Sequence, residues 1–380
     1  KAKGFTRFVI PAANANEASY IEGITVYALK SLREVVGILT CETRFAPLTQ
    51  RSFKAAVDAK KYDCDLSLVR GQKVAKRALE IAVAGGHNIL LAGPPGTGKT
   101  MLARCIPTIM PDMTFEEALE VTKIHSVAGS LTEEGIVSLR PFRTPHHTST
   151  VVALCGGGNV KVHPGEISMA HKGVLFLDEL PEYTRRTLES LRQPLEDRVI
   201  TVARAGGAVA FPADFILCAS MNPCPCGNYG SAYLACTCTP AQVQKYRSKI
   251  SGPLLDRIDL QVEVDGVKYD DLAGAADGET SAEVKKRVET ARKVQRVRFE
   301  GEPNLVNANM GEKQIKKYCR LSAECEDILR TAFETLRLSA RARSRIIKVA
   351  RTIADLDFSE EIKPEHILEA TSYRSYEANN

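Results

Sequence analysis

The strongest indication of the fold is the run Gly93-Pro94-Pro95-Gly96-Thr97-Gly98-Lys99-Thr100. It matches the phosphate-binding pattern G-x-x-x-x-G-K-[ST], and it stands between a short apolar strand at 88–91 and a helix. The glycines let backbone N–H groups converge on phosphate oxygens, and the start of the helix adds a partial positive charge. We therefore predict an ATP site formed by these residues and Met101, in which Lys99 contacts the β- and γ-phosphates and Thr100 binds Mg²⁺.

Two adjacent acids follow the next strong apolar strand, which spans 174–177. A continuous apolar run is expected of a parallel strand covered on both faces, and the carboxyl end of such a strand lies beside the phosphate loop. There Asp178 would hold Mg²⁺ through its water shell, and Glu179 would polarise the attacking water as a general base. The alternative is that the two acids only cap a helix.

Strands that alternate with helices predict an α/β fold with a parallel sheet, and the periods toward the C-terminus are helical. We expect an α/β core of the P-loop NTPase type over 65–270 and a helical lid over 271–380. Further elements are expected as strands at 88–91 and 215–219, with a helix at 72–84. The long gap between Lys99 and Asp178 predicts inserted elements, with a helix insertion around 125–165.

The first forty residues predict a smaller unit that is too short to be a domain alone. Strands are expected at 5–11 and 24–29, followed by a helix at 31–39. Residues 41–64 show no sustained period, so they are expected to form a linker. We interpret residues 1–40 as the end of a domain whose front precedes residue 1.

The composition is that of a globular protein, because 380 residues with 44% hydrophobic and 26% charged side chains allow two or three domains. Trp is absent, which disfavours aromatic stacking platforms for single strands. The net charge is only +5, yet residues 281–351 hold 18 Lys or Arg against 9 Asp or Glu. This basic region predicts a polyanion partner such as DNA; the alternative is a set of solvated helix faces.

Four of the eleven cysteines crowd into one short segment, as Cys224, Cys226, Cys236 and Cys238. The chain shows no signal peptide and no apolar run of bilayer length, so a reducing, cytoplasmic setting without a membrane partner is expected. In that setting the spacing C-x-C-x₉-C-x-C predicts a structural zinc site with four thiolate ligands. The pairs are tighter than the usual C-x₂-C, and disulfides or four unligated thiols are the alternatives.

Longer runs of the chain resemble the magnesium-chelatase-like branch of AAA+ proteins, and within it the ComM/YifB family. These runs are GGHNILLAGPPG at 85–96, RPFRTPHH at 140–147, PGEI at 164–167 and AHKGVLFLDEL at 170–180. The resemblance implies a hexameric ring that uses ATP to drive branch migration of DNA in recombination or natural transformation. It also implies that residues 1–40 end a Lon-protease-like domain. The protease Ser and Lys would precede residue 1, so no peptidase activity is expected.

Two residues take water-orienting and phosphate-sensing roles from this resemblance. Asn222 resembles the sensor-1 residue, because it follows a predicted buried strand. Arg341 resembles the sensor-2 arginine at the start of a lid helix, although Arg343 and Arg345 lie beside it. Arginine suits contacts with phosphate because its planar fork spreads positive charge over several oxygens.

A third residue, Arg257, resembles the arginine finger that related ring motors insert into a neighbouring subunit's site. The alternative for Arg257 is a salt bridge to Asp256 or Asp259.

A β-hairpin is predicted where 199–203 and 208–211 alternate around a glycine turn at 204–207. In related ring ATPases such a hairpin points into the central pore, so Arg204 is a candidate contact to the DNA backbone. A surface arginine without a role is the alternative.

Four histidines lie in loops of the inserted region, as His146, His147, His163 and His171. Adjacent or loop histidines are more often structural than catalytic, so no chemistry is assigned to them.

Two other functions remain open from the sequence. One is a protein-remodelling ATPase or chaperone without nucleic acid, which the Lon-like segment suggests. The other is a magnesium-chelatase-type motor subunit for metal insertion into tetrapyrroles. The Lon-like segment and the clustered cysteines argue against this second function.

Overall fold

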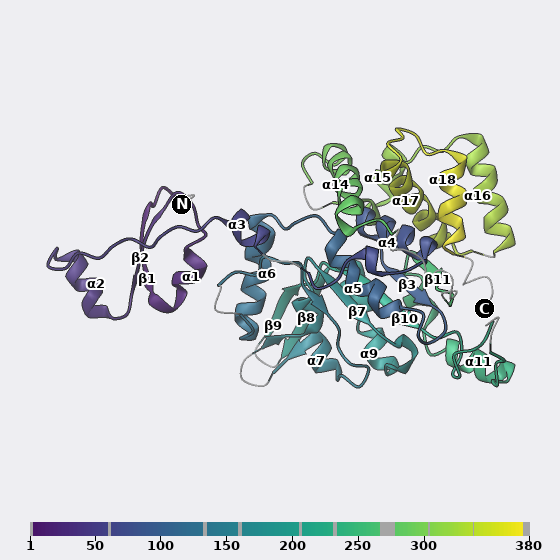
Figure 1. Cartoon of the computed structure of the whole chain (residues 1–380), viewed down its shortest axis with the longest axis horizontal. Helices are drawn as coiled ribbons and strands as arrows, with labels where there is room; N and C mark the ends of the chain where they lie inside the picture. Colours follow the sequence, from purple (N-terminus) through teal and green to yellow (C-terminus); the bar gives the residue numbers. More distant parts are fainter. Residues whose placement is uncertain are drawn as a thin grey trace. The chain divides into compact units, whose positions relative to one another are not determined.

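A five-stranded parallel sheet carries the phosphate loop (Figure 1). Its strands are β3 (Ile89–Ala92), β4 (Phe142–Arg143), β7 (Val174–Leu177), β10 (Ile216–Met221) and β11 (Leu260–Glu263), in the order β11-β3-β10-β7-β4. All neighbouring strands are parallel. The predicted α/β core with a parallel sheet is therefore confirmed.

The sheet separates two apolar clusters, which explains the continuous apolar runs in its strands. Ile89 and Leu91 of β3 face one cluster, while Leu90 and Ala92 face the other. Every residue of β3 and β7 is buried. Because successive side chains of a strand point to opposite faces, a sheet covered on both sides needs apolar residues at every position.

The computed structural model describes residues 3–59, 62–131, 135–158, 162–204, 207–230, 234–266, 278–302, 305–336 and 338–374. The chain divides into two compact units, one of residues 62–111 with 141–380 and one of residues 1–61 with 112–140. The expected boundary between core and lid at residue 270 lies outside the described residues.

Helices and hairpins complete the core of the larger unit. The helices are η2 (Leu66–Leu68), α4 (Lys73–Gly85), α5 (Lys99–Ile109), α7 (Val151–Cys155), α8 (Glu166–Met169), η3 (Leu180–Glu182), α9 (Arg185–Glu189), α10 (Arg192–Asp197), α11 (Pro240–Arg247) and α12 (Gly252–Leu255). The hairpins are β5 (Gly156–Gly157) with β6 (His163–Pro164), and β8 (Val199–Arg204) with β9 (Gly207–Pro212). In the described part of 125–165, where a helix insertion was expected, short elements such as α7, β5 and β6 stand instead, because glycines and prolines interrupt any long helix there.

Every regular element in the described part of the lid is a helix, as predicted, and these helices gather as one group in green to yellow in Figure 1. They are α14 (Ser281–Arg298), η4 (Asn307–Asn309), α15 (Glu312–Tyr318), α16 (Ala323–Thr335), α17 (Ala340–Leu356) and α18 (Pro364–Ser372). Helices α14 and α17 pack on α4 of the core, so the lid and the core share one apolar cluster.

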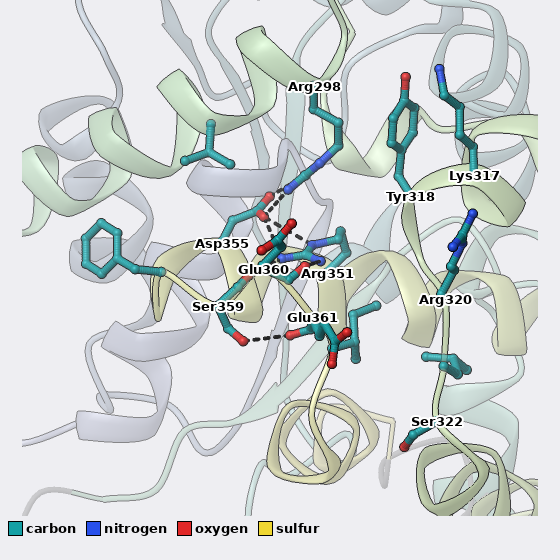
Figure 2. Close-up of a pocket in the computed structure, with 14 residues that line it drawn as sticks. Arg298, Lys317, Tyr318, Arg320, Ser322, Arg351, Asp355, Ser359, Glu360 and Glu361 are labelled. Atoms are coloured by element: carbon teal, nitrogen blue, oxygen red, sulfur yellow. Dashed lines mark hydrogen bonds and ion pairs between the residues drawn. The ribbon is translucent and has the colours of Figure 1, made fainter.

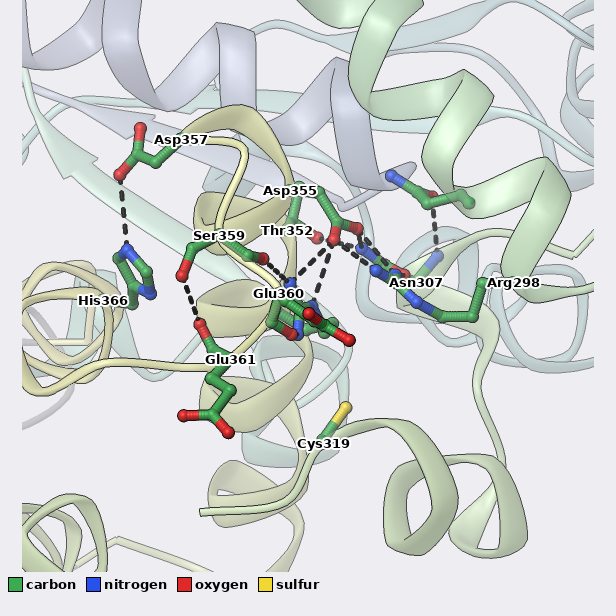
Figure 3. A network of polar contacts seen from close by, with 12 residues as sticks. Arg298, Asn307, Cys319, Thr352, Asp355, Asp357, Ser359, Glu360, Glu361 and His366 are labelled. Carbon is green, nitrogen blue, oxygen red and sulfur yellow. Dashed lines mark hydrogen bonds and ion pairs between the residues drawn. The ribbon is translucent and has the colours of Figure 1, made fainter. Parts of the chain in front are cut away.

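A buried carboxylate ties the lid together (Figure 3). Asp355 is 1% exposed and forms ion pairs with the guanidinium groups of Arg298 and Arg351. Asn307 Nδ2 donates to the same carboxylate at 2.8 Å and to Thr352 Oγ1 at 3.1 Å. These contacts fix α14 and η4 to α17, because a buried charge is stable only when it is paired.

A groove of about 870 Å³ opens beside this network (Figure 2). Lys317, Arg320 and Glu360 are among its lining residues, and Lys317 Nζ lies 4.7 Å from the ring centroid of Tyr318. Its walls carry both positive and negative side chains, so they define no single ligand chemistry.

The smaller unit contains β1 (Arg7–Pro11), η1 (Ala12–Asn14), α1 (Ala15–Ala18), β2 (Thr25–Leu29), α2 (Leu32–Leu39), α3 (Phe53–Asp58) and α6 (Phe115–Ala128). Strands β1 and β2 pair in parallel, with Phe8 opposite Val26. Tyr20 and Met113 join one apolar cluster with residues of α6. The expected linker at 41–64 contains α3, a helix too short to show a period in the sequence.

Among the described residues, no helix has both the length and the apolar character needed to cross a membrane.

Candidate nucleotide site

The phosphate loop joins β3 to α5, and Lys99 is the first residue of that helix. Gly96 and Gly98 have φ values of +79° and +87°, in the left-handed region where a side chain would be strained. Lys99 Nζ donates to the carbonyl oxygens of Gly93 and Pro94 at 2.7 Å each, and it lies 3.4 Å from Asn222 Oδ1. Burial lowers the pKa of Lys99. The loop therefore presents a poorly hydrated ammonium group that phosphate oxygens would engage.

Two hydroxyl groups converge on Asp178 at the end of β7. Thr100 Oγ1 donates to Asp178 Oδ2 at 3.3 Å, and Ser220 Oγ donates to Asp178 Oδ1. A carboxylate beside a hydroxyl group is a pair of hard oxygen ligands, which Mg²⁺ prefers. The residues thus fit a magnesium ion held between α5 and β7, as predicted for Thr100 and Asp178.

Glu179 follows in an uncommon backbone conformation, with φ +53°. Its backbone N–H donates to Ser220 Oγ and to Asp178 Oδ1, both at 3.2 Å. A non-glycine residue in the left-handed region is held there by its surroundings, and such residues concentrate at functional sites. Ser220 therefore fixes both acids, a role that the sequence analysis missed because nothing in its spacing marks it.

A histidine lies beside the Glu179 carboxylate. His147 Nδ1 is 3.7 Å from Glu179 Oε2, and the two side chains are 31% and 53% exposed. No chemistry was expected of this histidine from the sequence. It lies next to the predicted general base because β4 and β7 pair in the sheet, and this pairing is not marked in the sequence.

Asn222 stands directly after β10, beside the phosphate loop. The backbone N–H of Gly93 donates to the carbonyl of Met221 at 3.1 Å, which fixes the end of β10 against the loop. Asn222 therefore lies where the sensor-1 residue was expected, although its effect on water stays a prediction.

Arg257 is 9% exposed and pairs within its own chain. Its Nη2 forms an ion pair with Glu196, and its Nη1 donates to the carbonyl of Pro253 at 2.7 Å. The alternative prediction, a salt bridge from Arg257 to Asp256 or Asp259, was therefore wrong. Asp259 instead accepts from Arg345 at 2.5 Å and contacts His87 Nδ1 at 3.0 Å.

Arg341 is an exposed residue in the first turn of α17. Glu196 has a pKa lowered by its hydrogen bond from Arg257, and the charges of Arg341 and Arg345 lower it further. The candidate finger therefore contacts a glutamate whose carboxylate the candidate sensor-2 arginine influences through its charge. Within the described residues, no hydrogen bond or ion pair joins Arg341 to the phosphate loop.

The predicted hairpin is confirmed as β8 and β9, with Arg204 opposite Gly207. Ala205 and Gly206 of its expected turn lie outside the described residues, as does the side chain of Arg204. Contact between Arg204 and DNA stays a prediction.

The four clustered cysteines belong to the segment that follows Asn222, and they lie close together in space. Their sulfur atoms all lie within 4.8 Å of one another, and none is in a disulfide. Cys224 Sγ is 3.3 Å from Cys226 Sγ and 3.7 Å from Cys236 Sγ. Four sulfurs about 2.3 Å from a tetrahedral zinc ion would be about 3.8 Å apart, so this cluster fits zinc.

The cysteine loop also packs against the phosphate loop. A Cβ atom added at Gly227 would lie 2.7 Å from Pro95 Cδ, which is too close for any other residue. Arg247 supports the loop from α11, because its Nε donates to the carbonyl of Pro223 at 3.3 Å and its guanidinium lies over the Tyr229 ring. The cluster can therefore influence the shape of the nucleotide site.

The sequence of this chain is similar to a known protein family and to several known proteins. The family described as magnesium chelatase, subunit ChlI, matches residues 65–272, and its C-terminal companion matches residues 278–374. Competence protein ComM of Haemophilus influenzae is 42% identical over 375 residues, which are 98% of this chain and 72% of that protein. The uncharacterized protein YifB of Escherichia coli is 42% identical over 374 residues, with the same coverage.

A more distant relative shares only part of the chain. The magnesium-chelatase 67 kDa subunit of Chlorobaculum parvum is 28% identical over 159 residues, which are 40% of this chain and 22% of that protein.

Proposed function

Because this chain belongs to the ComM/YifB family of magnesium-chelatase-like AAA+ proteins, we propose that it hydrolyses ATP to do mechanical work on DNA. One observation carries the ATPase part of this proposal. At the start of α5, Thr100 lies within hydrogen-bond distance of Asp178 at the end of β7, and the neighbouring Lys99 contacts carbonyl oxygens of the phosphate loop.

The proposed reaction assigns a task to each of these groups. Lys99 exchanges the carbonyl oxygens it now contacts for phosphate oxygens of ATP. A magnesium ion held by Thr100 and Asp178 would neutralise charge on the phosphates. Glu179 accepts the proton of the attacking water, while Asn222 orients that water.

We further propose that the active form is a ring, most simply a hexamer, in which Arg257 reaches a neighbour's ATP. The ion pair of Arg257 with Glu196 must open for this, since the guanidinium group is engaged inside its own chain. An arginine finger stabilises the charge that develops on the transferred phosphate. Arg341 would serve the ATP bound by its own chain.

Mixing two inactive variants tests the shared site. Arg257→Ala keeps its own phosphate loop, and Lys99→Ala keeps its arginine, so a mixed ring contains some complete interfaces. We expect each variant alone to hydrolyse ATP at no more than about a hundredth of the wild-type rate, and the mixture to recover part of it. The measurement is phosphate release against protein concentration. A fully active monomer, with a rate per chain independent of concentration, would contradict shared sites.

DNA is the proposed substrate of the motor. The support is the basic region 281–351, the hairpin that carries Arg204, and the similarity to a protein named for competence. Contacts to phosphate carry no base code, so binding should depend on DNA structure rather than on sequence.

The test is ATP hydrolysis with and without single-stranded, forked and four-way DNA. We expect DNA to stimulate hydrolysis. The affinity of the protein for DNA should fall at least about tenfold between low and physiological salt, because binding releases condensed counterions. Arg204→Ala should weaken this stimulation, whereas Arg185→Ala, which removes an exposed arginine elsewhere in the core, should not.

Two outcomes would favour the other functions. Absence of DNA binding by the assembled, ATP-bound protein at low salt would favour a protein-remodelling ATPase. Metal insertion into a porphyrin would favour the chelatase motor, which the magnesium-chelatase match keeps open.

We also propose that Cys224, Cys226, Cys236 and Cys238 hold one structural zinc ion. All four ligands come from the protein, which leaves no open position for water, so the ion would stabilise the loop and not take part in catalysis.

A further inference from the structure

His147 lies on the loop between β4 and α7, at the carboxyl end of the sheet. Strand β4 pairs with β7 through Phe142 opposite Val174, so the residues that follow the two strands become neighbours. His147 follows β4 and Glu179 follows β7, and their side chains approach to 3.7 Å between Nδ1 and Oε2. Among the described residues, this is the one ion pair or hydrogen bond that engages the Glu179 carboxylate.

The loop that carries His147 is firmly anchored. Tyr183, four residues after Glu179, donates its hydroxyl to the carbonyl of Pro145 at 2.5 Å. Its ring meets the His147 ring edge-on at 6.4 Å, and burial raises the Tyr183 pKa, which keeps the hydroxyl a neutral donor. On the other side, Arg143 makes two hydrogen bonds to Glu166 at 2.6 and 2.7 Å.

The two adjacent histidines do different things. His146 Nδ1 contacts Thr148 Oγ1 at 2.8 Å and accepts from the Thr148 backbone N–H at 3.3 Å, so it closes the turn. Its ring lies 4.1 Å from the His147 ring, which it supports from one side. His147 is left with Nδ1 directed at the carboxylate of Glu179.

We propose that His147 is the positioning residue of Glu179. It holds the carboxylate where that group can take the proton of the attacking water. The proposal rests on the ATPase function above. The backbone of Glu179 is fixed by Ser220 and Asp178, but its half-exposed side chain keeps several rotatable bonds. A distance of 3.7 Å is longer than a hydrogen bond, so a side-chain rotation would have to close it. Catalytic contacts commonly tighten in this way when substrate binds.

Steady-state kinetics of the assembled wild type and single variants test this role. His147→Ala should lower kcat by about tenfold while the KM for ATP stays close to the wild-type value, because a freer carboxylate is seldom aligned and phosphate binding is untouched. His147→Gln, which retains a hydrogen-bond donor, should restore part of kcat. His163→Ala removes an exposed histidine of the same inserted region and serves as the matched control.

A double-mutant cycle separates positioning from structural damage. If His147 acts through Glu179, then His147→Ala should have no further effect on the residual rate of Glu179→Gln. An unchanged or increased kcat in His147→Ala would overturn the inference, as would an equal loss in both backgrounds. Thermal unfolding of each variant shows whether a loss of kcat reflects misfolding. If His147→Ala misfolds, the kcat of His147→Gln decides whether His147 positions Glu179. A wild-type protein without ATPase activity would instead refute the proposed function, and this inference with it.

Discussion

Replacing Glu179 with glutamine is expected to lower ATP hydrolysis by a factor of about 10² to 10⁴ while Mg–ATP still binds. The amide cannot take the proton of the attacking water, but Lys99, Thr100 and Asp178 remain to hold phosphate and metal. Lys99→Ala should lose nucleotide binding instead, since no other ammonium group occupies the loop. Binding of a fluorescent nucleotide and release of phosphate measure the two effects separately.

The matched control for this prediction is Glu182→Gln. Glu182 lies three residues further on and pairs with Lys249 at the surface, so its loss should leave turnover close to the wild-type rate. Turnover by Glu179→Gln at the wild-type rate would show that Glu179 is not the general base.

Removing two of the clustered thiols should have the second large effect. We expect about one zinc ion per wild-type chain by elemental analysis, and none in the double variant Cys236→Ser with Cys238→Ser. The variant should unfold at a lower temperature, and amide exchange should become faster around Cys224. ATPase activity should fall as well, because Gly227 packs on Pro95 of the phosphate loop.

Cys41→Ser provides the control, because Cys41 is an exposed thiol outside the cluster. It should change neither zinc content nor stability. Metal-free wild-type protein with four titratable thiols in the loop, and with stability unchanged by added zinc, would contradict the zinc site.

Much of the nucleotide site could be predicted from the sequence because its chemistry is written in contiguous residues. The phosphate loop needs fixed glycines and a lysine on one turn of chain, and the acids need to end a buried strand, so spacing alone marked Lys99, Thr100, Asp178 and Glu179. The cysteine cluster was predicted for the same reason, since close pairs of ligands are local features.

Other features could not be predicted because they depend on contacts between segments far apart in the chain. Ser220 reaches Asp178 across two paired strands, and Glu196 meets Arg257 from a helix 61 residues earlier. Neither partner is marked by spacing, and the sequence offered only the neighbours of Arg257 as candidates. The short helix α3 was missed because six residues are too few to show a period.

Local spacing and the burial of whole strands were enough to predict the fold class, the phosphate-binding and acidic residues and the set of four cysteines. Long-range packing instead sets the strand order, the grouping of residues 112–140 with the first 61 residues, and the place of His147 beside Glu179. The physical reason is that sheet pairing brings together the ends of strands that are distant in the chain, and no local pattern encodes which ends will meet.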